Sequence, residues 1–203
     1  MTTEETLAPN FVKLDGRVAS REDQKRALAR LLIARTDLSA AQFALKTILT
    51  QMTKGLRDPL IYPLHTAAII CYARPFTRNK ETGTLPATYS RFDSDEANAA
   101  HRDALDVRHK FVAHSDFDAR RPRIYPAGWK VGTDSTGREI GDKHVNADVQ
   151  TVLLGRRVCI RLHDNCIEIL NRLHANIDEM LQQLYGGMDL PTRPFALRID
   201  AGL

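Results

Sequence analysis

The chain has 203 residues, of which 43% are hydrophobic and 27% are charged, and its formal net charge is +4. That is about the length of one larger domain, and the composition is ordinary for a globular protein. No apolar run approaches the roughly 18 residues of a membrane span, and the first ten residues do not resemble a signal peptide, so we expect a cytoplasmic protein and no membrane partner. Of the 29 cationic residues, 21 are Arg, which favours phosphate contacts and therefore nucleic acid. A basic, solvated surface is the alternative interpretation.

The first 20 residues are expected to form a loose N-terminal arm. A long helix is predicted over residues 21–54, because apolar side chains recur there at steps of three and four. Gly55 is placed to end this helix, and the capping residues Asp37 and Ser39 would allow a break within it.

Two shorter helices are predicted next. In the first, Asp58 reads as the N-cap and Pro59 as the first helical residue, and the helix runs to residue 74. Residues 77–92 read as a loop. The second helix is expected to open with a capping box made by Asp93 and Glu96 and to end near Ser115.

Residues 117–148 have Gly and Pro punctuation and no helical period. They are predicted to be an inserted loop or β-hairpin, with residues 124–131 pairing with residues 138–145. Pro126 would then lie at an edge or a bulge.

The last helix has the clearest pattern, an apolar stripe that ends at Gly186 and Gly187. Asn146 or Asp148 is expected to cap its start. Its two cysteines, Cys159 and Cys166, are expected to be small buried hydrophobic residues. The sequence therefore predicts a mainly α protein: a bundle of about four long helices over residues 21–185, the insertion at 117–148, and an irregular tail over residues 186–203.

The most informative stretch runs from residue 102 to residue 118 and reads RDALDVRHKFVAHSDFD. Arg108 can hold a phosphate with its forked donors, and His114 can transfer a proton near neutral pH. These are the parts needed for metal-free RNA cleavage, in which the ribose 2′-OH attacks the adjacent phosphorus. His109 adds a second titratable group and Lys110 a second cation. Asp116 could orient a histidine or cap the helix.

Two considerations weigh against this interpretation. On an ideal α-helix, Arg108 and His114 are about 120° apart, so they converge only if the helix ends early or if two copies of the chain meet. A histidine near a helix C-terminus is also stabilised by the helix dipole without any catalytic role.

The string VRHKFVAHSD resembles the Arg-x(4–6)-His motif of the HEPN superfamily, in particular its abortive-infection branch. The string CYARPF at residues 71–76 resembles the end of the second helix in that branch. The likeness covers about residues 21–185, although its sharp part is ten residues long. The family's fold is an all-α bundle of four or more helices, which agrees with the pattern above.

The resemblance implies a metal-independent endoribonuclease that acts as a homodimer in phage defence or a toxin–antitoxin system, with no cofactor. Arg108 would bind the phosphate, His109 would be the polar neighbour and His114 the catalytic histidine. The partner would be RNA or a nucleotide, together with a nucleotidyltransferase-type antitoxin. One toxin branch carries a Tyr two residues after the catalytic histidine. Here Asp116 stands at that position, which departs from the pattern.

Four further residues are candidates for substrate binding. His101 lies two helical turns before Arg108, although a solvated or core-edge position is the alternative. Arg74, at the end of the second helix, could contact phosphate or be a plain surface residue. Trp129 and Arg121, in the insertion, could stack a base and hold its backbone, or Trp129 could anchor the loop by packing.

Three hypotheses follow. The first is a HEPN-like endoribonuclease; the second is a non-catalytic HEPN-like module for nucleotide binding, RNA binding or dimerisation; the third is a purely structural bundle. No metal ligand set with zinc spacing is present, so no metal site is predicted.

Overall fold

The computed structural model describes residues 13–14, 17–18, 20–51, 58–79, 83–113, 120–133, 139–141, 144–151 and 153–199. Its elements are β1 (Lys13–Leu14), β2 (Arg17–Val18), α1 (Arg21–Gln51), α2 (Ile61–Ala73), α3 (Asp95–Val107), β3 (Arg120–Tyr125), β4 (Lys130–Thr133), β5 (Glu139–Gly141), β6 (Asn146–Thr151) and α4 (Arg156–Tyr185). Three short turns, η2 (Arg74–Phe76), η3 (Ala87–Ser90) and η4 (Arg108–Ala113), join them. The chain is a mainly α helical bundle, as the sequence predicted.

α1 is one continuous helix, so the break that Asp37 and Ser39 would allow is not made. It opens at Ser20, whose hydroxyl accepts the Asp23 N–H at 3.1 Å while the Asp23 carboxylate accepts the Ser20 N–H at 3.3 Å. This reciprocal pair satisfies donors that a helix start otherwise leaves free. The expected stop at Gly55 lies outside the described residues.

α2 begins two residues later than the sequence predicted. Asp58 caps a turn rather than the helix, since its carboxylate accepts the N–H of Leu60 at 3.0 Å and its carbonyl accepts that of Ile61 at 3.0 Å. Pro59 is therefore a turn residue, and the first helical position is Ile61. Pro63 still lies in the first turn, where the N–H it lacks has no intrahelical acceptor.

The predicted cap of α3 is wrong by one residue. Ser94, not Asp93, has extended backbone dihedrals and accepts the Ala97 N–H on its hydroxyl at 3.1 Å. Asn98 reinforces this start by donating to the carbonyls of Phe92 and Ser94. A serine side chain is short enough to reach the third N–H of the helix from this position.

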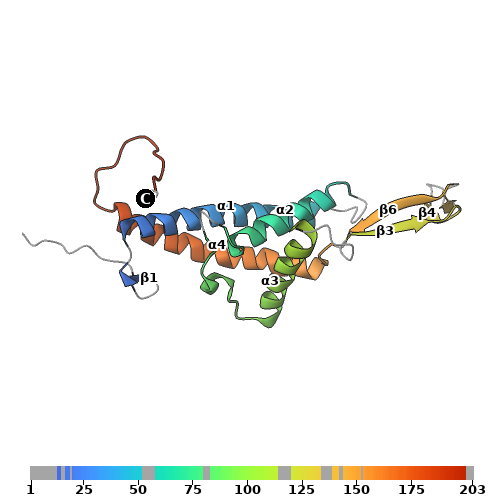
Figure 1. The fold of residues 1–203 in the computed structure, drawn as a ribbon, viewed down its shortest axis with the longest axis horizontal. Helices are drawn as coiled ribbons and strands as arrows, with labels where there is room; N and C mark the ends of the chain where they lie inside the picture. The colour runs from blue at the N-terminus through green and yellow to red at the C-terminus, as the bar shows by residue number, and fades with distance from the viewer. Residues whose placement is uncertain are drawn as a thin grey trace, which may run out of the picture.

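The insertion forms a two-part β-ribbon. β3 pairs with β6 in an antiparallel stem, from Arg120 opposite Thr151 to Tyr125 opposite Asn146, and β4 pairs with β5 at the tip. The antiparallel pairing of β4 with β5 agrees with the predicted hairpin. The ribbon is longer than predicted, because β3 and β6 extend it. Asn146 and Asp148 belong to β6, so neither caps α4, which starts at Arg156 after Gly155. Figure 1 shows the ribbon projecting from one end of the bundle.

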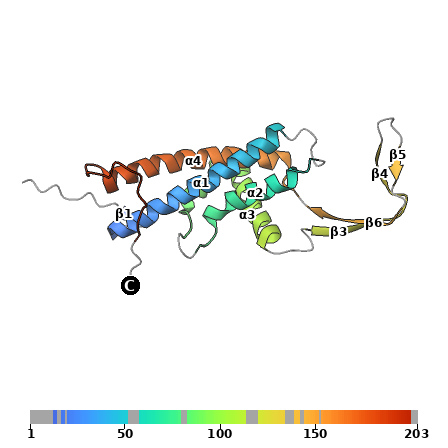
Figure 2. The same ribbon diagram turned by 90° about the horizontal axis from the view of Figure 1, so that it is seen from above.

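α1 and α4 form the long spine of the bundle, and α2 and α3 pack against it (Figure 2). The predicted stripe of α4 is buried, including Cys159 and Cys166, which are 1% and 0% exposed. α4 ends at Gly186, and Gly187 then adopts a φ of +76°, a left-handed value that glycine takes without strain. None of the described helices contains an apolar stretch of the length that a membrane span requires.

Candidate functional site

The motif begins on a change of helix type. α3 ends at Val107, and Arg108–Ala113 form the π-helical turn η4. The Arg108 N–H is shared between the carbonyls of Ala104 and Leu105 at this transition. π-Helical turns are rare and occur frequently at functional sites, because their wider winding redirects the side chains that follow.

Three motif residues can be placed in this turn. Arg108 is half-buried, while His109 and Lys110 are exposed. His114 and Asp116 lie outside the described residues. The angular separation of 120° assumed an ideal α-helix from Arg108 onward, and that assumption does not hold for a π-helical turn. His114 itself lies outside the described residues, so its convergence with Arg108 stays a prediction.

His101 lies in the core of the bundle. It is 8% exposed, its Nδ1 is 3.0 Å from the Tyr72 hydroxyl, and its ring meets that of Phe76 edge-on at 4.8 Å. Burial, with a smaller contribution from the nearby Arg102, lowers the pKa of His101, which favours the neutral ring. A neutral ring with its proton on Nε2 accepts a hydrogen bond from the Tyr72 hydroxyl at Nδ1, and this contact connects α2 to α3 instead of lining an open cleft.

Arg74 is paired within the bundle. Its Nη1 lies 2.6 Å from Oδ1 of Asp37 on α1, and Asp37 itself is buried. Burial raises the pKa of Asp37, and the Arg74 charge opposes that shift. The guanidinium remains half-exposed, but the Asp37 carboxylate already occupies the position beside it that a bound phosphate would take.

Arg121 lies on β3 and Trp129 comes directly before β4, and Figure 1 shows both strands away from the helices. Arg121 is paired with Gln150 in the stem. Trp129 is the last residue of a turn closed by the bond from its N–H to the Pro126 carbonyl at 3.0 Å, and its ring lies 5.9 Å from that of Tyr125. Pro126 is the first residue of this turn and belongs to neither pair of strands, so its missing N–H breaks no ladder hydrogen bond.

Sequence reasoning did not find the groove between α3 and α4. It has a volume of about 630 Å³ and is lined by apolar residues, Val158 and Ile160 among them, together with charged residues. Arg157 and Arg161 come from α4, and Glu96 and Asp103 come from α3. Their i, i+4 and i, i+7 spacings place each pair on one helix face, but only the packing of α3 on α4 brings the two faces together.

A buried Cys–His contact was also missed. His65 is 5% exposed, with Nδ1 3.2 Å from the Ile61 carbonyl and Nε2 3.4 Å from Sγ of Cys159. Burial raises the pKa of the Cys159 thiol to about 11, so the sulfur is a poor nucleophile at neutral pH. The pair connects α2 to the first turn of α4 and has a structural role.

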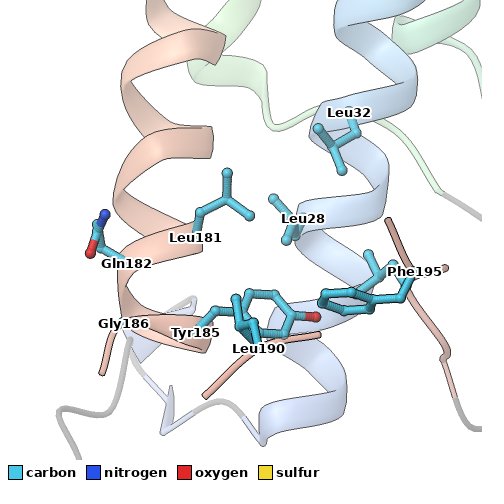
Figure 3. A pocket seen from close by; sticks show the side chains of 9 residues that line it. Leu28, Leu32, Leu181, Gln182, Tyr185, Gly186, Leu190 and Phe195 are labelled. Atoms are coloured by element: carbon cyan, nitrogen blue, oxygen red, sulfur yellow. The ribbon is translucent and has the colours of Figure 1, made fainter. Parts of the chain in front are cut away.

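An apolar pocket of about 460 Å³ lies between the start of α1 and the end of α4, under the C-terminal tail (Figure 3). Leu28 and Leu32 meet Leu181 across it, and Tyr185 faces Phe195 at a ring distance of 6.0 Å. The described residues that line it include no His, Asp, Glu, Lys or Arg, so the pocket offers no acid, base or phosphate-binding cation. Nor do the described residues contain a cluster of three or more His, Cys, Asp or Glu that could hold a metal ion.

Comparison with known protein families, curated proteins and solved structures finds no match to this chain. The resemblance to the HEPN superfamily therefore depends on the motif residues themselves.

Proposed function

We propose that this chain is a HEPN-like, metal-independent endoribonuclease that acts in phage defence or a toxin–antitoxin system. Arg108, His109 and His114 would carry the reaction. The observation that supports the proposal is the π-helical turn that begins at Arg108, because it sets the first half of the Arg-x5-His motif at the end of α3 in a helical bundle.

The chemistry follows from the residue types. A neutral histidine removes the proton of a ribose 2′-OH, whose oxygen then attacks the adjacent phosphorus. The bond from phosphorus to the 5′-oxygen breaks, and an acid protonates that oxygen. The products are a 2′,3′-cyclic phosphate and a free 5′-hydroxyl. Arg108 would bind the phosphate and stabilise the charge that develops on its oxygens.

The burial of Arg108 suits this role. Its side chain is half-buried, while the neighbouring Lys110 is exposed. A charge that is partly shielded from water interacts more strongly with a bound phosphate than a fully hydrated one does. Lys110 is better placed for the flanking phosphates of a longer RNA.

A homodimer belongs to the same proposal. Two copies could each contribute an Arg108 and a His114 to one cleft, which is the arrangement that the family resemblance implies. A nucleotidyltransferase-type antitoxin would be the regulatory partner. Asp116 replaces the tyrosine that such an enzyme modifies in one branch, so control at that residue is not proposed.

The test is cleavage of a single-stranded RNA substrate in the presence of EDTA. We expect the wild type to cleave, and Arg108→Ala and His114→Ala each to reduce the rate by about 100-fold or more. Arg102→Ala and His174→Ala are the matched controls. Each removes the same type of side chain as a motif variant, and both residues are exposed on helices. They should retain the wild-type rate.

Two results would contradict the proposal: a rate that EDTA abolishes, or motif variants that cleave as fast as their controls. If the wild type binds RNA or a nucleotide but never cleaves RNA, the chain is a non-catalytic binding module.

A further inference from the structure

The β-ribbon bends where its two pairs of strands meet. The stem ends at Tyr125 opposite Asn146, and the tip begins at Lys130 opposite Gly141. Residues 126–129 on one side and the described residues 144–145 on the other belong to neither pair of strands. We call the described part of this junction, residues 124–129 and 144–145, the elbow. Figure 2 shows the tip turned away from the direction of the stem at this point.

Large hydrophobic side chains are exposed at the elbow. Ile124 is 76% exposed, Val145 is 68% exposed and Trp129 is 52% exposed. Trp129 is the single tryptophan of the chain. Large apolar side chains that stay exposed on a projecting ribbon are candidates for a binding surface, and Trp129 is the largest of them.

The elbow also has a defined shape. Residues 126–129 form a β-turn in which Gly128 has a φ of +83°, a value that disfavours other residues. This turn places the Trp129 ring beside that of Tyr125, tilted by 48°. One aromatic ring thus supports the other, and half of the tryptophan surface remains open to a ligand.

The stem carries more cations than anions near the ring. The exposed Lys130 follows Trp129 directly, and β3 carries Arg120, Arg121 and Arg123, of which Arg123 has Asp148 of β6 as its cross-strand partner. An open aromatic ring beside cations is the combination that binds single-stranded nucleic acid, because the ring stacks on a base and the cations bind its phosphates.

We propose that the elbow is a binding site for single-stranded RNA, in which an unpaired base stacks on Trp129 while Lys130 contacts a neighbouring phosphate. RNA is named as the ligand because this inference rests on the proposed ribonuclease function. The ribbon would then hold the substrate at a distance from Arg108, so that one RNA strand spans both sites.

The single tryptophan makes the test direct, because all indole fluorescence reports on the elbow. The full chain carrying Arg108→Ala, which leaves RNA uncut, is titrated with an unlabelled uridine oligoribonucleotide. We expect saturable quenching of Trp129 fluorescence. Duplex RNA, whose bases are already stacked, and inorganic polyphosphate, which has no bases, should produce little quenching.

Variants measure the contribution of the ring. In the same background, Trp129→Ala should weaken binding of a labelled oligonucleotide at least about fivefold, which is the effect of losing one base–aromatic stack. Trp129→Phe should restore part of the affinity. Phe43→Ala is the matched control, since Phe43 is 71% exposed on α1 and its loss should leave binding unchanged.

Equal quenching by polyphosphate, or equal affinity of Trp129→Ala and Phe43→Ala, would overturn the inference. Failure of the elbow and failure of the nuclease are distinguishable. Cleavage that depends on Arg108 and His114 but not on Trp129 removes only the elbow site. Quenching by RNA that no variant ever cleaves removes only the catalytic proposal and retains an RNA-binding elbow.

Discussion

The hydroxyl of Tyr72 is the best single test of how the bundle positions α3. Tyr72 is 0% exposed, its hydroxyl lies 3.0 Å from Nδ1 of His101, and Nδ2 of Asn165 lies 3.4 Å from the same oxygen. These three side chains come from α2, α3 and α4. Tyr72→Phe keeps the ring and removes only the hydroxyl.

The expected cost can be worked from these contacts. Removing the hydroxyl leaves the buried His101 Nδ1 without a hydrogen-bond donor, which costs about 1–3 kcal/mol. Asn165 loses less, since its Nδ2 still donates to the Ala97 carbonyl at 2.9 Å. The total is about 2 kcal/mol, or a fall in Tm of about 4–8 °C for a domain of this size.

Urea unfolding followed by far-ultraviolet circular dichroism measures this difference. Tyr185→Phe is the matched control, because Tyr185 is half-buried at the far end of α4 and makes its ring contact with Phe195 in either form. We expect the control to change the free energy of unfolding by less than about 0.5 kcal/mol. If Tyr72→Phe were as stable as the control, the proposed bond between the Tyr72 hydroxyl and a neutral His101 would be refuted.

Three further predictions follow from the buried titratable groups. Burial holds the pKa of His101 below its ordinary 6.5, so the folded state favours the neutral ring. The stability that this group contributes is present above pH 6.5 and is lost as the pH falls below it. His101→Phe should therefore flatten the fall in the urea midpoint on acidification. Burial raises the pKa of Asp37 above 3.8, so its contribution to stability is present below pH 3.8 and is lost as the pH rises through the folded-state pKa. Asp37→Asn removes the titrating group and should flatten this loss in the same assay, and an unchanged pH dependence would contradict this reasoning. In the native protein, a thiol reagent should react first with the half-buried Cys71. Cys159 and Cys166 should react only after urea is added, because burial raises the pKa of their thiols to about 11 and about 12. Rapid labelling of all three cysteines without urea would contradict the burial of Cys159 and Cys166 on α4.

Local signals in the sequence were strong enough to predict the helices. The apolar periods of α1 and α4 are long, and Gly186 ends α4 as expected, because these features depend on residues a few positions apart. The helix starts were less predictable. Asp93 and Ser94 are both good caps, and the choice between them depends on which residue adopts the extended backbone before α3.

The candidate site divides in the same way. Its composition, with Arg108, His109, Lys110 and His114 in seven consecutive residues, is a property of the sequence alone. The π-helical turn could not be predicted from the sequence, because its wider winding is not visible in the apolar period of a short segment.

The helical class, the position of the insertion and the Arg-x5-His motif could all be found in the sequence, because each depends on neighbouring residues. Which polar groups face inward followed from the packing of the helices. The tertiary structure buried His101 against Tyr72, paired Arg74 with Asp37 across two helices, and left Trp129 exposed at the elbow. These outcomes depend on contacts between residues far apart in the chain, and the pattern of any one segment does not contain them.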